Sequence, residues 1–191
     1  MVATFERMLP NVLSWLVTGV LALLLALAAP NDSRVMGEVP GGVARTLGNE
    51  ATLVPEGLPA ERTLALINFG GHQRGEIEGW VQGLDLGRDP SIAWLRMPVL
   101  DDPGSAQARE ALQGKLLRHY PQPHERARLA PVFTDRGSFL RSAGLDGPEQ
   151  VYAVVLSRRG EVLARAQGPF NPNKAEALRE TLREKAIVGQ P

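Results

Sequence analysis

The sequence predicts an α/β domain with a mixed central sheet and helices on both faces, preceded by an N-terminal hydrophobic helix. Two observations lead to this prediction. Apolar runs of strand length alternate with stretches whose apolar residues recur at helical spacing. Near the C-terminus, two further strand-like runs are separated only by a tight turn, which adds an antiparallel pair to strands that helical crossovers make parallel. Helices on both faces are the simplest cover for such a sheet.

The first strand and helix of the domain are the clearest. Residues 63–69 (TLALINF) form an apolar run bounded by Gly70 and Gly71, which predicts a buried strand. The next stretch predicts a helix that stops at Gly87. Its apolar side chains share one helical face: Ile77, Trp80, Val81 and Leu84. We therefore expect Trp80 in the core.

The middle of the chain continues the alternation. Residues 91–97 (SIAWLRM) predict a second strand that Pro98 ends and that places Trp94 inward. Ser105 is the expected N-cap of a helix through Leu117. Its apolar residues again share a face: Ala108, Leu112 and Leu116. The proline-rich stretch that follows, HYPQPHE, predicts a loop.

The following elements are shorter. Residues 129–134 predict a third strand, with Pro131 at an edge or at the start of the strand. Ser138 is expected to cap a short helix that ends at Gly144. The order of elements up to this point predicts parallel strands joined by helices.

The C-terminal elements are a hairpin and a helix. Residues 151–156 and 161–166 predict two antiparallel strands joined by the turn between them. The last helix is expected to begin with Asn171 as its cap and Pro172 at its first position, and to reach Gly189.

The N-terminus carries an uncharged apolar run over residues 11–29. The A-x-A pattern Ala26-Leu27-Ala28 would allow signal-peptidase cleavage before Ala29. The run is also close to the ~20 residues that span a bilayer. We expect residues 1–30 to be a signal peptide or a membrane anchor, and both alternatives stay open. A buried core helix is the simpler interpretation, but the run is apolar on every face and lies at the N-terminus. If it is uncleaved, the chain contacts the membrane through residues 11–29.

Either alternative places the rest of the chain outside the cytoplasm, because Arg7 favours an N-terminus that stays inside. We therefore expect an exported or membrane-anchored protein of the bacterial periplasm. Residues 31–62 are expected to be a Gly/Pro-rich linker with a β-hairpin formed by residues 43–47 and 51–54. Residues 63–191 are then the α/β domain.

Composition excludes two classes of function. Lys plus Arg equals Asp plus Glu at 21 each, so the chain has no net charge that would suggest a nucleic-acid partner. The 191 residues contain no cysteine, which excludes thiol chemistry. We expect no cofactor and no metal.

Two stretches resemble the thioredoxin superfamily. Residues 151–170 (VYAVVLSRRGEVLARAQGPF) resemble the late hairpin of its periplasmic and peroxiredoxin-like members. Residues 66–80 (LINFGGHQRGEIEGW) stand where such proteins have a strand, a C-x-x-C loop and a helix. The resemblance covers residues 43–187. In organisation the chain is also similar to mitochondrial ATP-synthase assembly factors of thioredoxin-like fold.

The resemblance implies a redox-inactive, cysteine-free member of the superfamily. The loop that would carry two cysteines contains Gly71, His72, Gln73 and Arg74. The family's cis-proline would fall near Glu149 and Gln150, where Pro148 is the nearest proline. Because the loop opens a helix, its amide groups and Arg74 favour an anionic group. These four residues are the candidate binding site. The alternative is a solvated loop that has lost its role.

Other polar residues have simpler interpretations. His119 and His124 could share a metal but are more readily surface residues, since no nearby ligand completes a set. Asp101 and Asp102 suit a turn. The pair Arg158-Arg159 suits a solvated hairpin tip.

Three functions remain open at this point. The first is a non-catalytic binding or assembly module at the outer face of a membrane, with a protein partner in a membrane complex. The second is a cysteine-independent hydrolase or metal enzyme on the same fold. The third is a carrier of a small anionic ligand that binds at the loop with His72 and Arg74.

Overall fold

The computed structural model describes residues 35–41, 44–48, 53–58 and 60–184. The chain divides into two compact units, residues 1–34 and 35–191, and all described residues belong to the second. The predicted signal peptide or anchor at residues 1–30 lies outside the described residues. Within the described part, no helix is long and apolar enough to cross a membrane.

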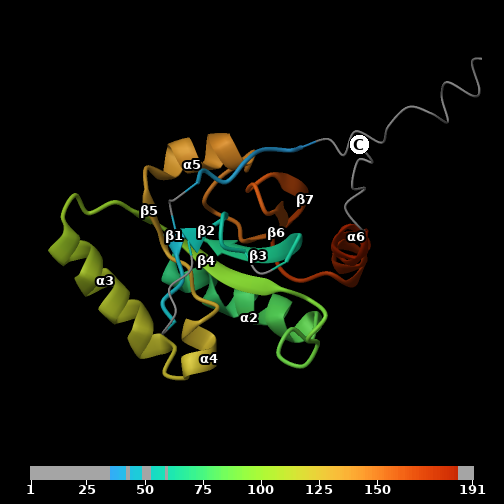
Figure 1. Cartoon of the computed structure of the whole chain (residues 1–191), viewed down its shortest axis with the longest axis horizontal. Coiled ribbons are helices and arrows are strands. Elements are labelled where there is room, and N and C mark those ends of the chain that lie inside the picture. Colours follow the sequence, from blue (N-terminus) through green and yellow to red (C-terminus); the bar gives the residue numbers. More distant parts are fainter. Residues whose placement is uncertain (1–34, 42–43, 49–52, 59, 185–191) are drawn as a thin grey trace, which may run out of the picture. The chain divides into compact units, whose positions relative to one another are not determined.

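A seven-stranded mixed sheet forms the centre of the domain, in the order β2-β1-β5-β4-β3-β6-β7 (Figure 1). Its strands are β1 (Ala44–Arg45), β2 (Leu53–Val54), β3 (Arg62–Asn68), β4 (Trp94–Asp101), β5 (Val132–Thr134), β6 (Tyr152–Ser157) and β7 (Val162–Gln167). Strands β3, β4 and β5 are parallel to one another, and β6 and β7 form an antiparallel pair beside β3. The predicted mixed sheet is confirmed.

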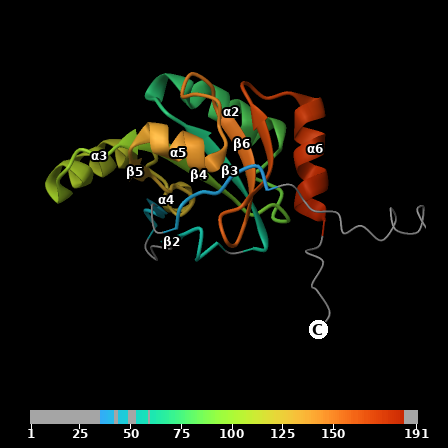
Figure 2. The ribbon, with the colours of Figure 1, turned by 90° about the horizontal axis from the view of Figure 1, so that it is seen from above.

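Helices cover both faces of the sheet, as predicted. They are η1 (Gly71–Gln73), α2 (Arg74–Gly83), α3 (Ala106–His119), α4 (Pro123–Arg126), α5 (Arg136–Ala143) and α6 (Pro172–Arg183). Helices α2 and α6 contribute to one apolar core and α5 to the other. Figures 1 and 2 show α3 extending away from the sheet at the end opposite α6. Helix α3 has no buried residue.

The two cores follow from the alternation of side chains along the strands. In β3, Leu64 and Leu66 face α2 and α6, while Ala65 and Ile67 face α5. Trp80 of α2 is fully buried, and its indole N–H donates to the Gly168 carbonyl at 2.9 Å. The predicted inward position of Trp80 is confirmed, and so is that of Trp94, which is 7% exposed.

The predicted helix starts hold in two cases and fail in one. Ser105 caps α3 by accepting the Ala108 N–H at 3.2 Å, and Asn171 caps α6 with Pro172 at its first position. Ser138 is not the cap of α5. Asp135 caps it by accepting the N–H of Ser138 at 2.7 Å. The Asp135 carboxylate, three residues before Ser138, takes the capping role, so the helix begins earlier in the chain than predicted, at Arg136.

Several predicted element bounds need correction. The strands expected from residues 91 and 129 begin at Trp94 and Val132. Helix α2 ends at Gly83, not Gly87, and α6 ends at Arg183, before the predicted Gly189. Pro98 lies inside β4, where it pairs with Asn68. Two residues before Pro98, the backbone of Arg96 forms hydrogen bonds with Arg128 and Ala130. The nitrogen of Pro98 faces the same side of β4, where β5 begins only at Val132, so a residue without an N–H is tolerated at this position.

The proline-rich loop contains a helix that the sequence did not indicate. Residues 123–126 form α4, with Pro123 at its first position and Gln122 as N-cap. Pro123 has the fixed φ that suits a first helical turn, so the proline starts a helix here instead of excluding one.

The described part of residues 31–62 joins the sheet. Strand β1 pairs antiparallel with β2, as the predicted hairpin requires, and also with β5. Val39 is fully buried in the core, and its N–H donates to the Gly160 carbonyl at 2.8 Å. The domain boundaries at residues 30 and 62 stay predictions.

Candidate functional site

The loop between β3 and α2 is held in place by the side chain of Gln73, which is 1% exposed. Its amide oxygen accepts the N–H groups of Phe69 at 2.7 Å and Gly70 at 3.2 Å. Its amide nitrogen donates to the Pro148 carbonyl at 2.8 Å. Gln73 therefore ties the loop to the segment before β6, and it is a structural link rather than an accessible group.

The backbone of that segment differs from the thioredoxin pattern. Among the described residues, the one cis peptide bond is Val54–Pro55, so the bond before Pro148 is trans. The departure that the sequence indicated around Glu149 and Gln150 is confirmed. The Pro148 carbonyl that Gln73 binds is thus presented by an ordinary trans backbone.

The other three predicted site residues are accessible to different degrees. Gly71 and His72 are exposed, and Arg74 is partly buried at the first position of α2. The Arg74 guanidinium lies over the Tyr120 ring, 5.8 Å from its centroid. A small pocket of about 50 Å³ lies between this loop and the end of α3, lined in part by Gly71, Arg74 and Leu116.

Arg74 is the first member of a row of guanidinium and aromatic groups, which we call the arginine–aromatic ladder: Arg74, Tyr120, Arg96, Trp94 and Arg128. Arg96 lies 5.4 Å from the Tyr120 centroid and 4.8 Å from that of Trp94. Arg128 lies 4.7 Å from the Trp94 centroid. Cations in such positions are attracted by the aromatic rings. The ladder connects the loop at α2 with the N-terminal end of β4.

The central arginine of the ladder is paired, and the two end arginines are not. Arg96 is 5% exposed, and its Nη2 donates to both carboxylate oxygens of Glu78 at 3.0 Å. Its Nε is buried without a hydrogen-bond partner among the described residues. Within the same part of the chain, neither Arg74 nor Arg128 forms an ion pair. The ladder therefore ends in two uncompensated cations.

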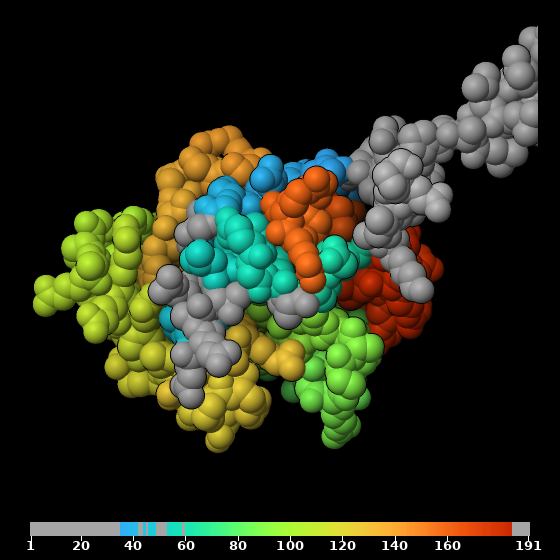
Figure 3. Space-filling model, in the orientation of Figure 1, coloured from blue at the N-terminus to red at the C-terminus, as the bar shows by residue number. Residues whose placement is uncertain are grey.

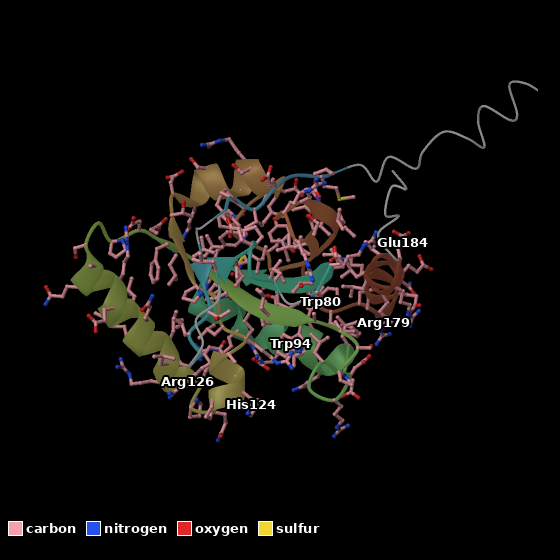
Figure 4. The ribbon with its side chains drawn as sticks, viewed as in Figure 1. Trp80, Trp94, His124, Arg126, Arg179 and Glu184 are labelled. Carbon is pink, nitrogen blue, oxygen red and sulfur yellow. The ribbon has the colours of Figure 1, made fainter. Side chains whose placement is uncertain are left out.

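A larger pocket of about 450 Å³ lies at the Arg128 end, between α2, β4 and α4. Its lining includes six polar or aromatic residues: Glu78, Trp94, Arg96, His124, Glu125 and Arg128. Figure 4 shows Trp94 beside α2, with His124 and Arg126 on α4 below it. Burial, with the neighbouring Arg96 charge as the smaller cause, lowers the pKa of Arg128. The guanidinium is thus partly removed from solvent and lies near a second positive charge.

Sequence reasoning did not find the ladder or this pocket. Its members come from α2, β4 and the segments around α4, so they share no spacing along the chain. The one local signal was Arg96, a charged residue at an inward position of the apolar run 91–97.

The remaining predicted candidates lie at the surface. His119 and His124 are exposed, and the described residues contain no group of three or more side chains that could hold a metal. Asp102 accepts the N–H of Gly104 at 3.0 Å and pairs with Arg109, which is the turn chemistry predicted for it. Asp101, for which a turn was also predicted, is instead the last residue of β4 and pairs with Arg136 at 3.3 Å. Arg158 at the hairpin tip pairs with Glu61 at 3.2 Å.

The order of elements defines the fold. A crossover helix follows β3, β4 returns parallel to β3, and an antiparallel hairpin with a closing helix ends the domain. The chain has a thioredoxin-like fold, and its sequence contains no cysteine.

Comparisons with solved structures agree with this fold. A protein from Aquifex aeolicus VF5 described as an electron transport protein is 12% identical, with a TM-score of 0.52 over 78% of this chain and 98% of its own. A second one from that organism, described as an electron transfer protein, is 14% identical with a TM-score of 0.51 over 78% and 96%. BsSco, a member of the Sco family of cytochrome c oxidase assembly proteins, is 15% identical with a TM-score of 0.50 over 78% and 95%.

These identities show a shared fold. No family model and no curated protein matches the sequence. The resemblance to mitochondrial ATP-synthase assembly factors stays a prediction.

Proposed function

We propose that this chain is a protein-binding module that uses a thioredoxin-like fold without thiol chemistry. The observation that carries the proposal is the loop at the start of α2. In redox members of the fold this position supplies a nucleophilic thiolate, whereas here the whole sequence lacks cysteine. The loop is nevertheless kept in a defined conformation by three hydrogen bonds of Gln73.

Arg74 is the group through which this loop binds a partner. It stands at the N-terminus of a ten-residue helix, whose dipole already favours an anion. The cation–π contact with Tyr120 holds the guanidinium near the ring and leaves its hydrogen-bond donors available. The surrounding pocket of about 50 Å³ is too small for an organic ligand, so it suits a single acidic side chain or a terminal carboxylate of a protein.

The proposed place of action is the outer face of a membrane. The support is the apolar run at residues 11–29, which acts as an export signal or an anchor. An assembly role is compatible with the fold, since BsSco belongs to a family of assembly proteins. A reporter that is active only in the cytoplasm, fused after Pro191, should be silent. Strong reporter activity would contradict the location.

The binding proposal is tested with the full-length tagged chain, purified from its native membrane. Proteins that co-purify are quantified for the unmodified chain, Arg74→Ala and the control Arg158→Ala. Loss of a charge-assisted hydrogen bond should reduce the recovery of the partner about tenfold for Arg74→Ala. Arg158→Ala removes the same charge from an exposed turn and should leave recovery unchanged. Equal recovery with both variants would contradict a role for the loop.

A further inference from the structure

The pocket at the other end of the arginine–aromatic ladder carries an inference that does not depend on the proposed function. It has a volume of about 450 Å³, within the range of small-molecule sites. In Figure 3, α4 (yellow) and the segment that follows α2 (green) stand apart at the bottom of the view. The lining residues come from α2 and the segment that follows it, from β4, and from α4 and the segment that follows it. The pocket is therefore reachable from the surface.

The unsatisfied polar groups of this pocket are hydrogen-bond donors. Arg128 has no ion pair within the described ranges, and its one aromatic contact leaves its N–H groups free. The Nε of Arg96 also lacks an acceptor within the described residues, but it is buried away from solvent. Arg128 is therefore the donor that a ligand in the pocket would use, since an acceptor supplied to a partly buried guanidinium forms a favourable hydrogen bond.

The carboxylates in the lining are already engaged. Both oxygens of Glu78 accept from Arg96. Glu125 accepts the N–H of Gln122 at 3.3 Å, within the first turn of α4. Glu78 compensates Arg96, whereas Arg128 forms no ion pair in the part of the chain that the structure describes. Glu125 keeps its charge in the lining, so the pocket offers one unpaired guanidinium, which suits a single carboxylate better than a more highly charged anion.

We propose that this pocket binds the carboxylate of a small organic acid, with Arg128 as the main donor and Arg96 as the second positive charge. A planar carboxylate fits a guanidinium through two parallel hydrogen bonds. The partly exposed Val81 offers an apolar surface for the organic part of the ligand, and Trp94 forms part of the pocket wall. Inorganic phosphate shares the oxyanion chemistry, but it carries more charge at neutral pH and has no apolar part.

Trp94 provides a direct readout of binding. Its indole N–H donates to the Leu86 carbonyl at 2.9 Å, close to the pocket. Trp80 donates to Gly168 and is absent from the pocket lining, so its indole signal is an internal control. The experiment titrates benzoate, and separately inorganic phosphate, into isotope-labelled full-length chain. Indole N–H signals are followed by NMR.

Benzoate should shift the Trp94 signal at millimolar concentration and leave the Trp80 signal in place. Arg128→Gln should weaken benzoate binding about tenfold or more, because it removes a charge-assisted hydrogen bond. Arg158→Gln, which changes the net charge equally, should not. Glu125→Gln should strengthen binding, since it removes a negative charge from the lining.

Three results would overturn the proposal. The first is a Trp94 signal that neither anion moves. The second is equal binding by Arg128→Gln and the unmodified chain, which would show an unspecific effect. The third is tighter binding of phosphate than of benzoate, which would assign the pocket to a phosphate group instead of an organic acid. None of these outcomes bears on the partner recovery that tests Arg74.

Discussion

The two ends of the arginine–aromatic ladder differ in how their surroundings are satisfied. At the Arg74 end, Gln73 saturates the neighbouring backbone, and the pocket is only about 50 Å³. At the Arg128 end, a pocket of about 450 Å³ contains a guanidinium without a counter-ion and lies beside a buried donor without an acceptor. At the Arg74 end, the neighbouring backbone groups are hydrogen-bonded and one charged side chain is accessible. At the Arg128 end, a larger pocket is lined by a guanidinium that has no ion pair within the described residues.

This difference shows that a thioredoxin-like fold does not by itself decide where a chain presents unpaired polar groups. Function depends on the groups that a site presents, and a shared fold leaves those groups free to change. We propose that the loop at α2 binds a protein side chain and that the far end of the ladder binds a small molecule.

The largest stability effect is expected when the loop loses its internal link. Gln73→Leu leaves the N–H groups of Phe69 and Gly70 and the Pro148 carbonyl without partners. Unmet buried polar groups of this kind should lower the free energy of unfolding by about 2–4 kcal/mol. Urea unfolding measures the change, with the exposed Gln82→Leu as control. A loss no larger than that of the control would mean that the loop does not depend on Gln73.

A smaller effect is expected at the centre of the ladder. The Arg96 side chain is 6% exposed and that of Glu78 is 37% exposed, so the arginine is the charge that needs its partner. Glu78→Gln should lower the free energy of unfolding by about 1–2 kcal/mol, because a buried cation then loses its counter-ion. Glu110→Gln on the exposed α3 is the matched control.

The double variant with Arg96→Met and Glu78→Gln sharpens this test. It removes the buried charge together with its partner, so it should be no less stable than Glu78→Gln alone. A double variant that is clearly less stable would show that Arg96 stabilises the fold by packing and not by its pair with Glu78.

Much of the fold could be predicted from the sequence, because local periodicity determines it. The buried faces of β3 and α2 and the β6–β7 hairpin follow from apolar spacing and turn residues. Pro98 and α4 were missed because a proline ends or permits an element according to its neighbours in space. The choice of Asp135 over Ser138 as a cap has the same cause, since both residue types suit that position.

The candidate site was only half visible in the sequence. Arg74 could be found because a known motif places it at a helix start. Arg128 could not be found in this way, because its contacts are with Trp94 and Arg96. These residues are about 30 positions away in the sequence and come close only in the folded domain. Gln73 was correctly placed in the loop, but its burial could not be inferred from its sequence neighbours.

The smallest effect is expected on the α5 face, which lies outside the ladder. Hydrogen bonds from Ser138, first from its backbone N–H, lower the pKa of Asp135 below its ordinary value of 3.8. The lowered folded-state pKa makes the stabilisation present above the unfolded pKa and lost as pH falls through the folded pKa. The difference in urea midpoint between the unmodified chain and Asp135→Ala should therefore shrink in acid.

Ser105→Ala is the control for this pH dependence, because Ser105 caps α3 without a titrating group. Its difference from the unmodified chain should not change over the same acidic range. A parallel change in both variants would mean that the effect belongs to acid unfolding in general and not to the Asp135 carboxylate.

The most direct test of the account compares both ends of the ladder in one set of proteins. Partner recovery and benzoate binding are measured for the unmodified chain, Arg74→Ala and Arg128→Gln. We expect Arg74→Ala to lose partner recovery and keep benzoate binding, and Arg128→Gln to do the reverse, each by about tenfold. Loss of both properties in both variants would show a single site that the ladder joins, and would contradict the assignment of two separate ones.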